Sequence, residues 1–144
     1  HPEYGMKMKA DAKANGDMIS SVNIFIDSEK AHPIQEEEFI KIERIKGKVL
    51  LIGSEDDALW EAAKYIRRME KRLETHEHEC EVESYIYEHA THFVFPEGMV
   101  KTIIPVFGDL MSRVFKAGRE YPKECKAARI DIEKRVTDVV KAWK

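Results

Sequence analysis

Three residues of this 144-residue chain have the types and positions needed for acid–base chemistry. Asp56 and Asp57 follow an apolar run in LLIGSEDDALWEA, and His92 follows a second run in EHATHFVFP. If the two runs are neighbouring parallel strands, their carboxyl ends meet at one edge of the sheet. An aspartate that orients a histidine general base makes up two-thirds of a nucleophilic triad. The spacing therefore favours a catalytic dyad formed by His92 and one of the two aspartates.

A structural role for the same residues also fits their positions. Asp56 could cap the helix that follows, Asp57 could favour the helix dipole, and His92 could lie in a surface loop. A triad also needs a nucleophile, and the chain contains neither GxSxG nor GxCxG. Walker A and GxGxxG motifs are absent as well.

A zinc site is the minor alternative, and it would use His76, His78 and Cys80 in THEHEC. These residues alternate, so on a strand they would share one face, and zinc takes such ligands. The segment supplies only three ligands and follows a predicted helix, where surface histidines are common. We therefore predict neither a metal nor an organic cofactor. The acidic run QEEEF (residues 35–39) is typical of a solvated face.

Hydropathy predicts the elements that would position the dyad. KVLLIG (residues 48–53) is a continuous apolar run between turn residues, which suits a strand buried on both faces. Residues 56–78 carry apolar side chains at spacings of three and four, which predicts an amphipathic helix. Alternation at the start of residues 80–95 predicts a second strand. Strand, helix and strand form a βαβ unit, whose two strands should be parallel.

The flanking segments are less regular. Residues 1–20 are predicted to form a loop or poorly ordered lead-in, and residues 21–144 a single α/β domain. VNIFID (residues 22–27) fits a short strand or a helix turn, whereas residues 95–109 are rich in loop formers. A closing amphipathic helix is expected after Pro122. Its apolar stripe comprises Ala128, Ile132, Val136, Val139, Val140 and Trp143.

Composition narrows the class of protein. The chain is 43% hydrophobic and 35% charged, with a net charge of −3, so no basic excess exists for nucleic-acid binding. No apolar run approaches the roughly 20 residues that cross a bilayer. Cys80 and Cys125 have no CxxC spacing, which favours a reduced pair in a cytoplasmic protein. His1 stands first and no signal peptide is visible, which suggests a fragment or a processed chain.

Two segments, IERIKGKVLLIGSEDDALWEAAKYIRRMEKRL and YEHATHFVFP, resemble a known family. They are similar to the C-terminal region of the α/β-hydrolase family that contains acyl-CoA thioesterases and bile acid-CoA:amino acid N-acyltransferase. The similarity is strongest over residues 40–100, and the double acid followed by Trp60 is its most specific part. The resemblance implies the C-terminal portion of an α/β-hydrolase fold, with parallel strands, a crossover helix and a C-terminal helix.

The resemblance also implies roles for individual residues. Asp57 would be the triad acid, because it stands three residues before Trp60, and His92 would be the triad base. Two features depart from the family pattern. Thr91 replaces the glycine beside the catalytic histidine, and Ser54 and Glu55 separate Gly53 from the acidic pair.

The implied activity is acyl transfer to water or to an amine by a serine or cysteine hydrolase of the acyl-CoA thioesterase type. The family's nucleophile lies N-terminal to the matched region, and residues 1–40 are too short to hold it, so the chain alone is expected to be inactive. In the complete enzyme the partner is an acyl thioester or ester substrate. A second copy or a complementing N-terminal half is also expected. The alternative is a non-catalytic α/β module that dimerises or pairs with a partner.

Overall fold

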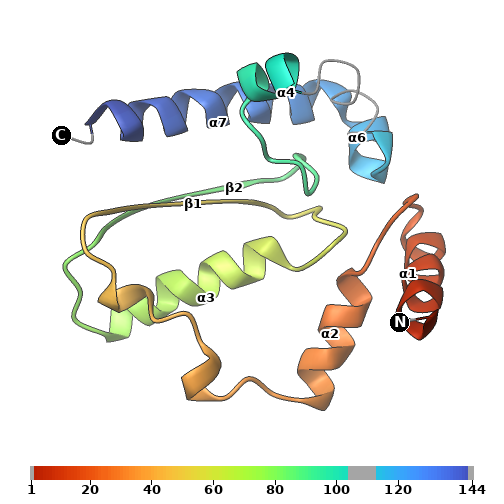
Figure 1. Cartoon of the computed structure of the whole chain (residues 1–144), viewed down its shortest axis with the longest axis horizontal. Helices are drawn as coiled ribbons and strands as arrows, with labels where there is room; N and C mark the ends of the chain where they lie inside the picture. The colour runs from red at the N-terminus through yellow and green to blue at the C-terminus, as the bar shows by residue number, and fades with distance from the viewer. Residues whose placement is uncertain (1, 104–112, 143–144) are drawn as a thin grey trace.

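A pair of parallel strands forms the centre of the molecule (Figure 1). The structure is a computed structural model, and it describes residues 2–103 and 113–142. Strand β1 (Lys48–Ser54) pairs with β2 (Glu81–Tyr87), in a register that runs from Lys48 opposite Glu81 to Ser54 opposite Tyr87. Helix α3 (Ala62–Thr75) connects the two strands. The predicted strand–helix–strand unit and its parallel pairing are therefore confirmed.

Two helices cover the two faces of this sheet. Helix α3 lies on one side of the strands and α7 (Pro122–Ala142) on the other, and both contact β1 (Figure 1). Ile66 of α3 and Ile132 of α7 are buried in the two layers. Gly53 permits the close approach of α3, because a Cβ there would lie 2.8 Å from Ile66 Cδ1. These helices and strands together form a mixed α/β structure.

Strand β1 is less buried than its sequence predicts. Residues 49–52 are only half-buried, although an apolar run of this kind suits a strand covered on both faces. The difference arises because the described part of the chain forms a two-stranded sheet, so each strand has a single neighbour.

The prediction of a loop over residues 1–20 is wrong for most of that segment. Helix α1 spans Pro2–Asn15, and Gly16 follows it at a positive φ of 76°, the conformation that commonly ends a helix. The segment is rich in Ala, Lys and Met, which are strong helix formers. The buried Asp11 accepts a hydrogen bond from the backbone N–H of Asn23 (3.0 Å) and so fixes α1 against the next helix.

The next segment is helical as well. Helix α2 (Val22–Ala31) confirms the helical alternative for VNIFID. Two single-turn 3-10 helices follow, η1 (Glu36–Glu38) and η2 (Ile42–Arg44). Glu29 of α2 pairs with Arg68 of α3, which links this N-terminal layer to the βαβ unit.

The C-terminal part contains two short helices before α7. Helix α4 (Glu97–Ile103) occupies part of the segment expected to be loop-rich, and residues 104–109 of that segment lie outside the described residues. Helix α6 (Lys116–Glu120) is followed by α7, the predicted closing helix, which begins at Pro122 itself and not after it. Trp143, the last member of the predicted stripe, also lies outside the described residues.

A buried ion pair fixes α4 to α7. Arg129 Nε donates to Glu97 Oε2 at 2.8 Å, and both residues are buried. Burial alone would raise the pKa of Glu97, but the hydrogen bond and charge of Arg129 hold that pKa below its usual value. Within residues 2–103 and 113–142, no helix has the length and apolar character needed to cross a membrane.

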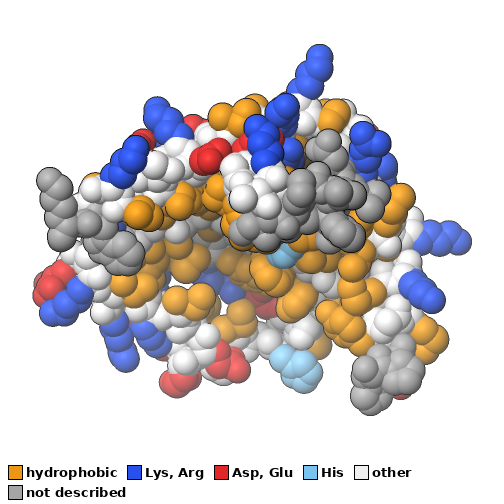
Figure 2. All heavy atoms as spheres, turned by 45° about the horizontal axis from the view of Figure 1, so that its top comes forward, with side chains coloured by type: hydrophobic (Ala, Val, Ile, Leu, Met, Phe, Trp, Pro, Cys, Tyr) orange, Lys and Arg blue, Asp and Glu red, His pale blue; other side chains and the backbone are white. Residues whose placement is uncertain are grey.

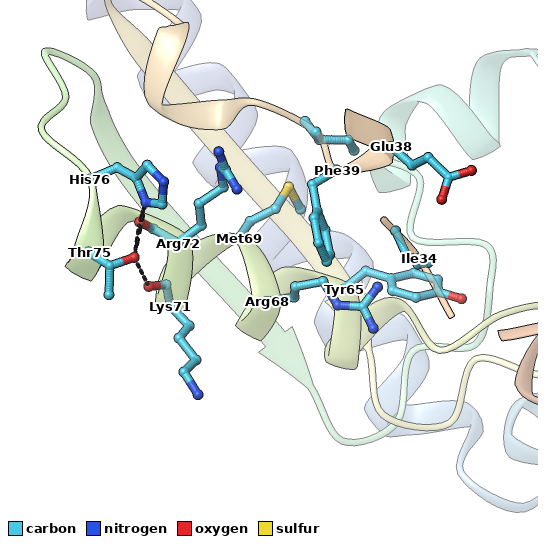
Figure 3. Close-up of a pocket in the computed structure, with 11 residues that line it drawn as sticks. Ile34, Glu38, Phe39, Tyr65, Arg68, Met69, Lys71, Arg72, Thr75 and His76 are labelled. Carbon is cyan, nitrogen blue, oxygen red and sulfur yellow. Dashed lines mark hydrogen bonds between the residues drawn. The ribbon is translucent and has the colours of Figure 1, made fainter. Parts of the chain in front are cut away.

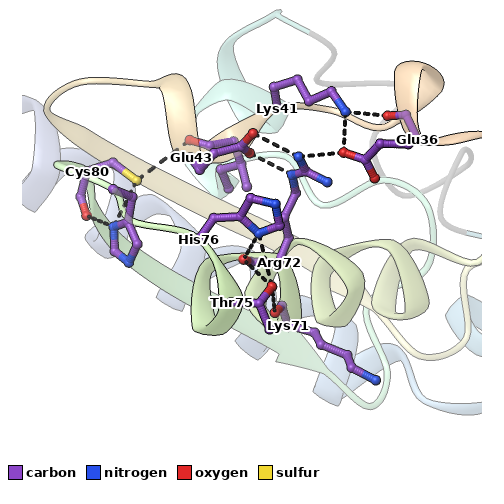
Figure 4. Close-up of polar contacts among 10 residues, drawn as sticks. Glu36, Lys41, Glu43, Lys71, Arg72, Thr75, His76 and Cys80 are labelled. Carbon is purple, nitrogen blue, oxygen red and sulfur yellow. Dashed lines mark hydrogen bonds and ion pairs between the residues drawn. The ribbon is translucent and has the colours of Figure 1, made fainter.

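Arg72 of α3 organises the connection between α2 and β1 (Figure 4). Its guanidinium donates to both carboxylate oxygens of Glu43, at 2.6 and 2.9 Å, and lies 2.9 Å from Glu36. Lys41 also binds Glu36, at 2.6 Å. The acidic run predicted to form a solvated face thus includes a carboxylate that binds α3. Hydrogen bonds from Arg72 lower the pKa of both Glu36 and Glu43 to about 2.

These pKa shifts predict a stability contribution that depends on pH. Both carboxyl groups have a folded pKa of about 2 against an ordinary value of 4.5, so the contribution is complete above pH 4.5 and is lost as the pH falls toward 2. We expect Arg72→Met to lower the Tm at neutral pH, and the Tm difference from the native chain to shrink over that interval. Thermal unfolding followed by circular dichroism measures the difference. The neighbouring substitution Lys71→Met is the control, and a difference that does not vary with pH would contradict the prediction.

Candidate active site

The parallel register brings two loops together at one edge of the sheet. β1 ends at Ser54 and β2 at Tyr87, and these residues are partners in the register. The backbone N–H of Glu55 donates to the carbonyl of Tyr87 at 2.9 Å, so the pairing continues into the loops. The loop after β1 carries both aspartates, and the loop after β2 carries His92. Acidic and imidazole groups therefore face each other across this edge, where ligands bind in open α/β sheets.

Asp57 and His92 are in direct contact. His92 Nδ1 lies 3.0 Å from Asp57 Oδ2 and 3.1 Å from Asp57 Oδ1. Asp57 is buried, with 8% of its surface exposed, and His92 is half-buried. Because a carboxylate accepts, contact with Asp57 favours the neutral tautomer whose proton is on Nδ1, and in that tautomer Nε2 is the atom that can accept a proton. The contact has the geometry that a general base and its orienting acid require.

A capping role is present as well, but at Asp57 and not at Asp56, the residue for which it was considered. Asp57 Oδ1 accepts hydrogen bonds from the backbone N–H groups of Leu59 (2.8 Å) and Trp60 (3.3 Å). The same carboxylate therefore caps the turn before α3 and binds the imidazole. These backbone bonds hold the Asp57 side chain in one orientation, which in turn restricts the imidazole of His92.

Aromatic side chains enclose one side of His92. The ring of Trp60 meets the imidazole edge-on, with centroids 4.6 Å apart and planes at 85°. Phe93 and Phe115 follow at 5.8 and 6.5 Å, and Phe25 contacts Trp60 at 6.3 Å. Part of this apolar cluster is solvent-exposed, including 42% of the surface of Trp60. Figure 2 shows wide hydrophobic areas on one face of the molecule.

Asp56 also binds the loop after β2 that carries His92 (the histidine loop), but it contacts residues other than His92. Its Oδ2 lies 3.1 Å from His89 Nδ1, and its Oδ1 accepts the backbone N–H groups of Thr91 (3.0 Å) and Ala90 (3.3 Å). The ring of His89 stacks on Tyr121 with centroids 3.6 Å apart. His89 is a contact residue that neither a motif nor hydropathy periodicity indicated. The only available signal was its position, three residues before His92 in EHATH.

Thr91 has an unusual backbone conformation. It is buried, its φ is +60°, and its Oγ1 accepts the backbone N–H of Phe93 at 3.1 Å. A positive φ is uncommon for a β-branched residue, since its Cβ crowds the backbone. The residue that departs from the expected glycine therefore adopts a glycine-like conformation.

The nearby serines have other partners. Ser20 and Ser21 donate to the carbonyls of Ala58 (2.8 Å) and Leu59 (2.7 Å). The single hydroxyl proton of Ser54 has two acceptors within reach, the Asp56 carboxylate and the carbonyl of Tyr87. None of these three hydroxyls bonds to His92, so they act as structural groups that fasten the loop after β1.

The zinc alternative gains no support. Within the described residues, no group of three or more His, Cys, Asp and Glu side chains is arranged to hold a metal. His76 Nδ1 lies 2.9 Å from the carbonyl of Arg72, whereas His78 Nδ1 lies 3.1 Å from the carbonyl of Cys80. The Cys80 thiol is buried and donates to the carbonyl of Ile42.

Two cavities of about 370 Å³ lie in different parts of the molecule. One is a mostly apolar pocket between α3 and residues 34–40, with Phe39, Tyr65 and Met69 in its walls (Figure 3). The other is lined by Asp56, Asp57 and His89, together with groups from α1, α2 and α6. Only the second cavity borders the acidic pair.

A comparison with protein families identifies the family of this region. The family described as BAAT / Acyl-CoA thioester hydrolase C terminal matches residues 1–114. This range includes both strands, α3 and the loops that carry Asp57 and His92, and it begins well before residue 40. Comparison with curated proteins and with solved structures gives no match.

The conformation of Thr91 leads to a paired mutational test. Thr91→Ala and Thr91→Gly both remove the hydroxyl and the methyl group, but only glycine relieves the strain at positive φ. We expect Thr91→Gly to have a free energy of unfolding about 1 kcal/mol greater than that of Thr91→Ala. Urea denaturation of the two variants measures this difference, and a Thr91→Ala variant of equal or greater stability would contradict it.

Proposed function

Because the chain belongs to the BAAT / acyl-CoA thioester hydrolase C-terminal family, we propose that it forms the C-terminal part of an acyl-CoA thioester hydrolase or acyltransferase. In this proposal Asp57 and His92 are the acid and base of a catalytic triad. The observation that carries it is the 3.0 Å contact between His92 Nδ1 and Asp57 Oδ2 at the carboxyl edge of the sheet.

Each atom of the pair has a defined task in acyl transfer. His92 Nε2 accepts the proton of a serine or cysteine nucleophile as that group attacks the thioester carbonyl. The protonated imidazole then gives this proton to the departing CoA sulfur, which leaves as a thiol. Asp57 holds the proton-bearing Nδ1 and stabilises the positive charge of the imidazolium. In the second half-reaction, His92 removes a proton from water or from an amine as that acceptor attacks the acyl-enzyme. The imidazolium then gives this proton to the nucleophile, whose bond to the acyl group breaks, and the free enzyme is restored.

The arrangement of elements supports an α/β-hydrolase fold for the complete domain. The acid follows one strand and the base follows the next, and the two strands are parallel with helices on both faces. In that fold the nucleophile stands on a sharp turn between an earlier strand and its helix. We therefore expect the nucleophile and the oxyanion hole to come from polypeptide outside the βαβ unit. No metal or organic cofactor has a role in this chemistry.

The test is an assay of acyl-CoA thioester hydrolysis, with release of the CoA thiol as the readout. It uses the protein encoded by the complete reading frame. We expect Asp57→Asn to lower kcat by about 10⁴-fold, because the base loses its orienting acid, and His92→Gln to lower it by about 10⁴- to 10⁶-fold, because the base itself is removed. Far-UV circular dichroism should show that the fold is retained.

Matched controls are available on α2 and just after it. Asp27→Asn and His32→Gln change the same residue types at exposed positions and should leave kcat unchanged. Wild-type rates in the His92 and Asp57 variants would reject the dyad. A native protein that hydrolyses no acyl-CoA would reject the proposed activity as a whole.

A second candidate function is a non-catalytic module that associates with another copy of the chain. The observation that favours it is a series of aromatic contacts in which the ring of His92 connects Phe25 and Trp60 with Phe93 and Phe95. Of these, Phe25, Trp60 and Phe95 have 37–42% of their surface exposed. Contiguous exposed apolar surface of this kind is typical of an interface.

Self-association can be measured by sedimentation velocity. If the cluster is an interface between two copies, the chain should dimerise at concentrations on the order of 10 µM, and Trp60→Glu should shift it to monomer. Val140→Glu is the control, since Val140 is exposed at the far end of α7. A native chain that stays monomeric at all concentrations would exclude this candidate.

A further inference from the structure

We propose that Asp56 is a positioning residue that holds the loop of His92 in the conformation needed for contact with Asp57. This inference rests on the proposed function, since it concerns the acid–base pair assigned there. It gives the two adjacent aspartates different tasks. Asp57 binds the imidazole of His92, and Asp56 binds the residues that precede it.

The first support is the number of bonds that converge on the Asp56 carboxylate. Its three partners in the second loop are consecutive residues, His89 at 3.1 Å, Ala90 at 3.3 Å and Thr91 at 3.0 Å. His92 is the next residue in the chain. One side chain on the β1 loop therefore anchors the whole segment that leads to the proposed base.

The second support is the strained turn at Thr91. A β-branched residue at φ +60° is costly, so surrounding contacts must hold it in place. The Asp56 carboxylate accepts the N–H of Thr91 itself and that of Ala90, which stabilises this turn directly. Without these bonds we expect the backbone to relax toward negative φ, which would move the imidazole of His92 away from Asp57.

The third support is the attachment of Asp56 itself. Ser54 has only 1% of its surface exposed, and its Oγ donates to Asp56 Oδ1 while accepting the N–H of Ala90 at 3.1 Å. On the other side, the stacking of His89 on Tyr121 fixes the ring that binds Asp56 Oδ2. The carboxylate is thus held from both loops, as a positioning group must be.

The experiment measures which tautomer the His92 imidazole adopts in this chain. Nitrogen-15 NMR of the imidazole distinguishes the Nδ1–H form, which contact with Asp57 favours, from the Nε2–H form. At a pH where the ring is neutral, we expect the native chain to show the Nδ1–H form. Asp56→Ala should reduce the Nδ1–H fraction at least about twofold, although Asp56 does not touch His92.

Two further variants separate positioning from general stability. Asp56→Asn keeps an oxygen that can accept the N–H groups of Ala90 and Thr91, so it should restore the Nδ1–H form. Glu88→Ala removes an exposed carboxylate from the same loop and should leave the tautomer unchanged. A folded Asp56→Ala variant with the native tautomer would overturn the proposal.

The test has an outcome even if Asp56→Ala fails to fold. In the native chain, a scalar coupling across the hydrogen bond should connect the amide nitrogen of Thr91 with the side-chain carboxyl carbon of Asp56, and its absence would overturn the proposal. The tautomer also separates the two proposals, because it does not depend on catalysis. If Asp56→Ala shifts the tautomer of His92 but the His92→Gln enzyme remains active, only the catalytic role is rejected. If Asp56→Ala keeps the native tautomer but His92→Gln abolishes activity, only the positioning role of Asp56 is rejected.

Discussion

The parallel pairing of β1 with β2 is the constraint on which the rest of the site depends. Its seven-residue register ends with Ser54 opposite Tyr87, so the chain leaves both strands at the same level. An antiparallel pairing would place the acidic loop and the histidine loop at opposite ends. A parallel pairing also requires a crossover, which α3 supplies, and its close approach at Gly53 keeps the acidic loop against the sheet.

The site then depends on how two neighbouring carboxylates are used. Adjacent side chains on an irregular loop can point to different partners, and here one reaches an imidazole ring while the other reaches the backbone. The strain at Thr91 makes this division necessary. A glycine at that position would adopt the turn without help, whereas threonine needs external acceptors to hold a positive φ. The positive φ of Thr91 and the backbone bonds of Asp56 are thus parts of one physical arrangement.

The hydropathy pattern predicted the central βαβ unit because the strand pattern and the helix pattern are both strong there. The apolar run before Gly53 and the spacing of Ala63 and Ile66 leave few alternatives to strand and helix. Helix α1 was missed because it has no apolar stripe and its propensity signal is weaker than periodicity. The contact between His92 and one of the two aspartates followed from topology once the strands were parallel, whereas the choice of Asp57 over Asp56 came from the family resemblance. The bonds of Asp56 to the backbone could not be predicted, because they depend on a φ angle at Thr91 that its sequence disfavours.

The C-terminal segment takes part in this arrangement although the family match ends at residue 114. Phe115 lies among the rings around His92, and Tyr121 stacks on His89, the partner of Asp56. Arg129 of α7 holds Glu97 at the start of α4, just after the histidine loop. Since burial of an unpaired charge is costly, this ion pair fixes how the loop leaves the sheet. The loop that carries His92 is therefore held from three directions, by the acidic loop, by Tyr121 before α7 and by α7 itself, and these contacts restrict the imidazole of His92 to one orientation.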